Sequence, residues 1–218
     1  MNWLVTAIIT GITSFGATNI DDIVILTLFF AQVNATFRRR HIVVGQYLGF
    51  TALILACLPG FFGGLILPKA WIGILGFVPI FIGIIHLFKR ENDAEVQAVS
   101  TEFDASRSNV SVLSKLASVL SPQTYNVAVV TFANGGDNIG IYVPLFASSD
   151  PASLAVILTV FFLLIGVWCY IAYLLTRHRA IAPILTRYGK AIVPFILIGL
   201  GIFILVESGT YHLIPKFK

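Results

Sequence analysis

Two pairs of residues repeat the pattern Asn-x-x-Asp inside apolar stretches of the chain, Asn19 with Asp22 and Asn134 with Asp137. Residues three positions apart share one face of a helix, so each pair brings an amide oxygen and a carboxylate together. Oxygen ligands of this kind suit hard divalent cations such as Mg²⁺, Mn²⁺ and Ca²⁺. The spacing therefore predicts one cation site to which both pairs contribute.

The two aspartates are expected near the middle of a membrane. Asp22 lies 16 residues before Arg38, and Asp137 lies 13 residues before Asp150. An ionised Asp at that depth costs about 2.5 to 3.5 kcal/mol on insertion scales, and no Lys or Arg is placed at a comparable depth to pair with it. A lone intramembrane Asn or Asp can also have a purely structural role, in which it forms a hydrogen bond to a neighbouring helix. That role does not require the same pattern twice. The compensating charge is therefore predicted to be a bound cation.

The residues around the pairs predict a local break in each helix. Gly135 and Gly136 stand directly before Asp137 and weaken the helix there, and Gly16 precedes the first pair. A break frees backbone carbonyls as further oxygen ligands. Asp21 and Asn138 adjoin the pairs but face about 100° away on a regular helix, so they are second choices as metal ligands.

Transmembrane helices are the elements that must position these residues. Of 218 residues, 57% are hydrophobic and only 11% are charged, which is far from the balance of a soluble domain. A spanning helix needs about 20 apolar residues. Ser121-Pro122 and Asp150-Pro151 each indicate an N-cap followed by a first-turn proline, opening two of the predicted helices. Six stretches are apolar over a sufficient length: residues 3–31, 42–67, 70–88, 122–147, 151–176 and 190–208.

The chain divides into two halves around a polar segment. A shift of 115 residues places the first Asn-x-x-Asp pair on the second and Pro79 on Pro194. Residues 1–90 then form a first three-helix repeat, residues 91–121 a linker and residues 122–218 a second three-helix repeat. With three helices per half, the second copy enters the membrane from the opposite side. The predicted fold class is an all-α integral membrane protein with six transmembrane helices in two inverted repeats.

Basic residues indicate how this fold is oriented. In a six-helix topology, 11 of the 14 Lys and Arg residues fall on the side of the linker. The positive-inside rule then predicts a cytoplasmic linker and both termini outside the plasma membrane. Because these residues form short clusters at helix ends, the high pI does not indicate nucleic-acid binding. The expected partners are the lipid bilayer and a divalent cation, and a homo-oligomer is left open.

The residues that remain favour transport over catalysis. Cys57 and Cys169 lack the spacing of a disulfide framework or a zinc site, and no cofactor is expected, because the cation is cargo. An intramembrane aspartyl protease also uses two embedded aspartates that share a proton. Its Gly-x-Gly-Asp pattern is absent, because Asn134 stands where a glycine is required.

The segments Ala17-Thr18-Asn19-Ile20-Asp21-Asp22 and Phe132 to Tyr142, read FANGGDNIGIY, resemble those of the cadmium resistance transporter family, within the lysine-exporter superfamily. The resemblance covers essentially the whole chain. It implies a six-helix efflux protein for a divalent metal. It also implies that Asn19, Asp22, Asn134 and Asp137 carry the family signature.

The identity of the cargo follows less directly from the residues. Cadmium prefers thiolate ligands, whereas the repeated pairs offer oxygen, so manganese, magnesium and calcium compete with cadmium as cargo of the same architecture. An amino-acid exporter or a passive channel is also compatible with this architecture. The intramembrane carboxylates exceed the charge of one divalent ion, which predicts that protons occupy the empty site and exchange for metal.

Overall fold

The computed structural model describes residues 2–88, 121–136, 138–176 and 181–210, and within these ranges all regular structure is helical. The helices in chain order are α1 (Trp3–Asn19), α2 (Asp22–Ala31), α3 (Arg39–Ile66), α4 (Lys69–Ile72), the 3₁₀ helix η1 (Gly73–Gly76), α5 (Phe77–Phe88), α7 (Pro122–Asn134), α8 (Ile139–Ser148), α9 (Pro151–Leu175) and α10 (Ile181–Glu207).

Two helices in the described part of the chain, α3 and α9, are long and apolar enough to cross a membrane, and the bent pair α1 and α2 counts as a third span when taken together. The other apolar helices described, Gly73–Phe88, Ile139–Ser148 and Ala191–Glu207, are shorter. The fold is thus helical and suited to a membrane. The arrangement of six spans in two inverted repeats, and the division at residues 90 and 121, stay predictions.

The two predicted helix starts at Ser121 and Asp150 are confirmed. The side chain of Ser121 accepts a hydrogen bond from the backbone N–H of Thr124, and Pro122 occupies the first turn of α7. The carboxylate of Asp150 accepts from the backbone N–H groups of the second and third residues of α9. Both side chains therefore satisfy amide groups that the helix itself leaves without acceptors.

Close contact between α3 and the pair α7 and α8 depends on glycines spaced four apart. A methyl group at Gly45 would lie 2.6 Å from Cβ of Val127 on α7. One at Gly60 would lie 2.8 Å from the carbonyl oxygen of Val143 on α8. Gly49 and Gly64 make similarly close approaches one turn further along α3. Glycines at this spacing let membrane helices approach backbone to backbone.

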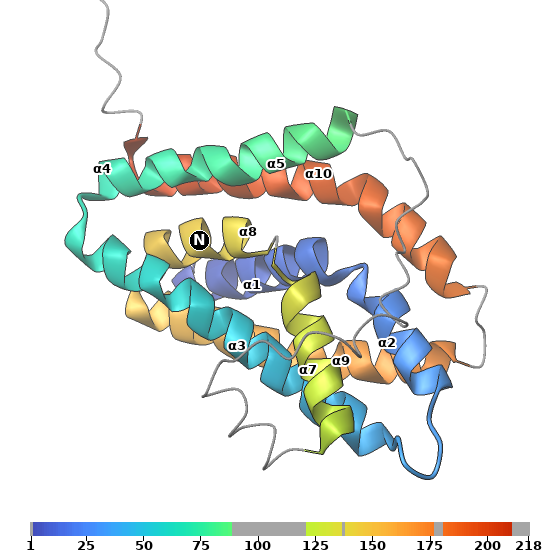
Figure 1. Cartoon of the computed structure of the whole chain (residues 1–218). Helices are drawn as coiled ribbons and strands as arrows, with labels where there is room; N and C mark the ends of the chain where they lie inside the picture. The colour runs from blue at the N-terminus through green and yellow to red at the C-terminus, as the bar shows by residue number, and fades with distance from the viewer. Residues whose placement is uncertain (1, 89–120, 137, 177–180, 211–218) are drawn as a thin grey trace, which may run out of the picture.

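Each bent or interrupted segment packs on a long helix from the other half of the chain. The helices α1 and α2 lie along α9, whereas α7 and α8 lie along α3. The helices α5 and α10 lie side by side and close the bundle on one side (Figure 1). This exchange of partners brings the two breaks, one after α1 and one after α7, into the same region of the molecule.

One end of the bundle carries basic residues. The guanidinium of Arg39, at the start of α3, lies 4.3 Å from the centre of the Tyr173 ring near the end of α9. The Phe30 ring near the end of α2 lies 5.9 Å from the same ring. The predicted cytoplasmic linker, residues 91–121, lies almost wholly outside the described residues, as does the C-terminal segment 211–218. The orientation in the membrane stays a prediction.

Candidate functional site

Both Asn-x-x-Asp patterns lie where a helix stops. The helix α1 ends at Asn19 and α2 begins at Asp22, with an angle of 64° between the two helices. The helix α7 ends at Asn134 and α8 begins at Ile139. The predicted break in each half is therefore confirmed. The prediction that Asn19 and Asp22 share a face of one regular helix is wrong, because the break falls between them.

A hydrogen bond joins the two patterns across the halves of the chain. The amide nitrogen Nδ2 of Asn134 donates to Oδ1 of Asp22 over 2.5 Å. Asp22 is buried, with 6% of its surface exposed, and Asn134 is partly buried. Asp137, the fourth residue of the predicted site, lies outside the described residues.

Gln46 of α3 and Thr131 of α7 extend this contact, and neither was predicted from the sequence. Nε2 of Gln46 donates to the second oxygen of Asp22 over 3.4 Å. The hydroxyl of Thr131 donates to Oε1 of Gln46 over 2.6 Å. Both side chains are buried. The sequence features that could have predicted these two residues are a Gln inside an apolar segment and a Thr one helical turn before Asn134.

The side-chain amide of Asn19 is held in one orientation. Its Nδ2 donates to the carbonyl oxygen of Phe15 over 3.0 Å, to Oγ1 of Thr18 over 2.8 Å and to the hydroxyl oxygen of Tyr142 over 2.8 Å. A backbone carbonyl can only accept, so the NH₂ group must face Phe15 and Oδ1 must face the other way. The amide cannot be turned over without losing that bond.

Oδ1 of Asn19 is therefore an acceptor without a donor. Only 1% of the Asn19 surface is exposed, and this oxygen is the one buried side-chain N or O atom, among the described residues, with no hydrogen-bond partner. A buried polar atom left without a partner costs about 1 to 3 kcal/mol. A structure retains such an atom where a ligand, an ion or a water completes it. The electron pairs of an amide oxygen suit a cation.

Tyr142 of α8 links the first break to the second half of the chain. Its hydroxyl lies 2.6 Å from Oγ1 of Thr18 and also accepts the bond from Asn19. The Tyr142 ring is fully buried and packs against Phe146 and Phe161, with ring centres 5.9 and 4.9 Å apart. The rigid aromatic packing fixes the hydroxyl. Tyr142 belongs to the second sequence motif, but its contact with Asn19 was not predicted.

The backbone at the end of α1 is also fixed from outside its own helix. Nε1 of Trp168 on α9 donates to the main-chain carbonyl of Asn19 over 2.7 Å. This carbonyl is one of those that the end of a helix leaves without an internal donor. The bond from Trp168 occupies this main-chain carbonyl, so the side-chain Oδ1 is the acceptor of Asn19 that has no donor.

The second-choice ligands Asp21 and Asn138 both lie inside the breaks. Each precedes the first residue of the following helix, α2 or α8, and neither caps that helix with its side chain. Asn138 is buried, with 3% of its surface exposed, whereas Asp21 is half-buried. Two polar side chains at cap positions are thus not used for capping.

Within the described residues no three His, Cys, Asp or Glu side chains form a group able to hold a metal. The polar side chains around the breaks offer amide, carboxylate and hydroxyl oxygens instead. Cys57 and Cys169 are buried free thiols. This set of oxygen atoms matches hard or intermediate divalent cations better than a purely soft ion.

Comparison with known proteins identifies the family. The family model described as cadmium resistance transporter matches residues 15–217. The match covers both breaks and nearly the whole chain, so the chain belongs to the cadmium resistance transporter family. Neither curated proteins nor solved structures gave a match to this chain.

Proposed function

We propose that this member of the cadmium resistance transporter family exports a divalent metal cation through a site between its two helix breaks. Six membrane-spanning segments in two inverted three-helix repeats form the pathway, with both termini outside the plasma membrane. Family membership favours a transported metal cation over an amino acid or a peptide substrate. The exchange of packing partners between the halves supports the inverted repeat, since a two-fold relation would generate it.

The unpartnered Oδ1 of Asn19 is the observation that carries this proposal. Its amide nitrogen is fully engaged, so the oxygen is oriented before any ion arrives, and binding costs little ordering of this side chain. Three of the proposed ligands lie among the described residues: Asn19, Asp22 and Asn134. The fourth proposed ligand is Asp137. Asp21 and Asn138 stand next to them as supplementary oxygen ligands.

Cation binding requires a change at Asp22. Both of its oxygens now accept hydrogen bonds from amide NH₂ groups, those of Asn134 and Gln46. Rotation of the Asn134 amide by half a turn replaces the NH₂ group with Oδ1, so that amide and carboxylate point oxygens at the same ion. The NH₂ groups thus satisfy the carboxylate in the absence of metal and give way to the ion when it binds.

The cargo follows from this set of ligands. Oxygen ligands favour manganese, magnesium or calcium, and cadmium enters such a site as an ion of about the size of calcium. The family name favours cadmium, whereas the ligands around the breaks favour manganese as a close competitor.

Proton exchange completes the proposed mechanism. Asp21, Asp22 and Asp137 together carry more negative charge than one divalent ion neutralises. A proton held by the empty site is then released when metal binds, and transport couples to the pH gradient. Metal binding without proton release, and flux that ignores a pH gradient, would replace the antiporter with a uniporter or channel.

A flux assay in proteoliposomes tests the proposed function. Cadmium, manganese, magnesium and calcium are compared with and without a pH gradient, for the unaltered protein, Asp22→Asn and the neighbouring control Asp21→Asn. We expect flux of at least one of the four cations, a loss of about tenfold or more in Asp22→Asn, and a milder effect in Asp21→Asn. Equal flux in Asp22→Asn and the unaltered protein contradicts the site. The absence of flux for every cation contradicts the function.

A further inference from the structure

A cavity of about 400 Å³ opens at the end of the bundle that carries the N-terminus. Its walls come from four different helices: the start of α1, the end of α8, the start of α9 and the end of α10. The lining includes one residue from each of these walls: Trp3, Leu145, Asp150 and Glu207. The cavity therefore lies at the opposite end of α9 from Tyr173 and the basic residue Arg39 beside it.

The described lining of this cavity carries negative charge. Two carboxylates, Asp150 and Glu207, line it, and among the residues that the structure describes no Lys, Arg or His does. Both side chains are exposed. Hydrogen bonds from the Ser153 hydroxyl and backbone hold the pKa of Asp150 below its ordinary value, which keeps this carboxylate ionised. Two negative charges at the mouth of a cavity attract cations and repel anions.

Hydroxyl groups continue from the cavity along α1 toward the break. Thr6, Thr10, Ser14 and Thr18 recur at every fourth residue, so their hydroxyls follow one slowly turning face of the helix. Thr6 and Thr10 line the cavity. From Thr10 to Asn19 the helix rises roughly 13 Å.

The hydroxyls of Ser14 and Thr18 present electron pairs and not protons. Oγ of Ser14 donates to the carbonyl oxygen of Thr10 over 2.5 Å, and Oγ1 of Thr18 donates to the carbonyl oxygen of Ser14 over 2.9 Å. Since the Ser14 and Thr18 hydroxyl protons are used within the helix, these two oxygens act toward other groups as acceptors, as Oγ1 of Thr18 does toward Nδ2 of Asn19. A face of this kind suits a cation that sheds part of its hydration.

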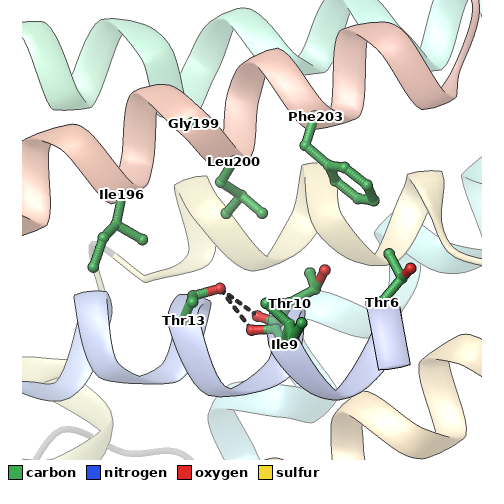
Figure 2. Close-up of a pocket in the computed structure, with 8 residues that line it drawn as sticks. All are labelled: Thr6, Ile9, Thr10, Thr13, Ile196, Gly199, Leu200 and Phe203. Atoms are coloured by element: carbon green, nitrogen blue, oxygen red, sulfur yellow. Dashed lines mark hydrogen bonds between the residues drawn. The ribbon is translucent and has the colours of Figure 1, made fainter. Parts of the chain in front are cut away.

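A second cavity of about 310 Å³ adjoins the first, because Thr6, Thr10 and Phe203 line both. Figure 2 shows Thr6, Thr10 and Thr13 of α1 opposite Leu200 and Phe203 of α10. The space thus reaches the depth of Thr13, which is about 9 Å before Asn19 along the helix. Gly199, which also lines it, leaves room, as a methyl group there would meet no atom within 4 Å.

We infer that the cavity bounded by Asp150 and Glu207 is an acidic vestibule through which the metal cation moves between Asn19 and the membrane face that carries the N-terminus. The inference rests on the proposed function, because that function supplies the cation. It adds the route and the residues that attract the ion. A lipid tail is the competing occupant, and the apolar side of the second cavity would suit one.

Accessibility of single cysteines tests the vestibule. Thr10→Cys is placed in a background in which Cys57 and Cys169 are alanine, and Ile12→Cys, which is half exposed on another face of α1, serves as the matched control. Proteoliposomes of fixed orientation are treated with a cationic and an anionic methanethiosulfonate, neither of which crosses a membrane. We expect Thr10→Cys to react from the N-terminal side only, and Ile12→Cys to stay unreactive because it faces lipid.

Charge and flux supply two further readouts. The ratio of cationic to anionic reaction rates at Thr10→Cys is expected to exceed that of free 2-mercaptoethanol by about tenfold, and to fall toward it in Glu207→Gln. Modification by the cationic reagent is expected to block metal flux. If Thr10→Cys itself abolishes flux, Thr6→Cys at the mouth takes its place in this assay.

The outcomes separate the route from the function. Unreactive Thr10→Cys, a rate ratio equal to that of the free thiol, or full metal flux after complete modification would each overturn the vestibule while the proposed function stands. Reaction that is blocked by lipid-soluble compounds but insensitive to charge would assign the cavity to a lipid tail. Absence of divalent flux in the unaltered protein would overturn both.

Discussion

Replacement of Tyr142 by phenylalanine removes a single oxygen from the contact between the two breaks. That hydroxyl lies 2.6 Å from Oγ1 of Thr18 and 2.8 Å from Nδ2 of Asn19. The ring packing is retained, because Phe has the same ring. Asn19 keeps two other acceptors for its NH₂ group, the Phe15 carbonyl and the Thr18 hydroxyl. Unfolding free energy is therefore expected to fall by only about 1 to 2 kcal/mol.

The effect on metal binding is expected to be larger than this structural loss suggests. With one of its three acceptors gone, the Asn19 NH₂ group is held less firmly, so Oδ1 moves about its direction more widely and part of its ordering must occur on binding. A cost of about 1 kcal/mol corresponds to an affinity loss of roughly fivefold. Titration calorimetry with manganese and cadmium, on protein in detergent, measures this directly.

A double-mutant cycle and a matched tyrosine decide whether Tyr142 acts through Asn19. In an Asn19→Ala background, Tyr142→Phe should cause no further loss of affinity. Tyr47→Phe removes a hydroxyl that donates to the Phe162 carbonyl over 3.0 Å, so it should lower stability and leave affinity unchanged. Intact affinity in Tyr142→Phe, or an effect that is undiminished without the Asn19 amide, would refute this role of Tyr142.

Three further predictions test packing, ligands and orientation. Gly64→Ala should destabilise the protein by about 2 kcal/mol, because the methyl group meets the Ala147 backbone, whereas Gly63→Ala should be neutral or stabilising, since open space surrounds that position; thermal unfolding in detergent compares them. Replacing both cysteines by alanine should leave manganese affinity within twofold, and a tenfold loss would make a thiol a ligand. A cysteine at Ser106 should be labelled only from the cytoplasm of intact cells, and outside labelling would reverse the orientation.

The sequence was most informative where local chemistry decides the structure. Hydropathy located the apolar segments that the structure builds as helices, and the Ser121 and Asp150 caps followed from side-chain type alone. The breaks followed from glycines and from polar residues inside apolar runs.

The contacts around the site depended on tertiary structure and were not predictable from spacing. Gln46 and Thr131 are 85 residues apart in sequence, and Thr18 and Tyr142 are 124 apart, yet each pair shares a hydrogen bond. The contact between Gln46 and Thr131 exists because Gly45 and Gly49 let α7 approach α3 closely, and the contact between Thr18 and Tyr142 joins α1 to α8 across the two halves of the chain. The same-face expectation for Asn19 and Asp22 failed for a local reason, because it assumed a regular helix through a break that the sequence itself predicted.

The central claim, that one cation binds between the two breaks, is tested most directly by metal affinity and thermal stability measured together in Asp22→Asn and Asp137→Asn. In Asp22→Asn the acceptor for the Asn134 amide is retained, so folding should survive, and melting should be unchanged or slightly raised because a costly intramembrane charge is gone. Affinity should fall by at least about 30-fold, or 2 kcal/mol, as a charged ligand is lost. Near-normal affinity in both variants, with lowered melting temperatures, would instead make these aspartates structural and contradict the account.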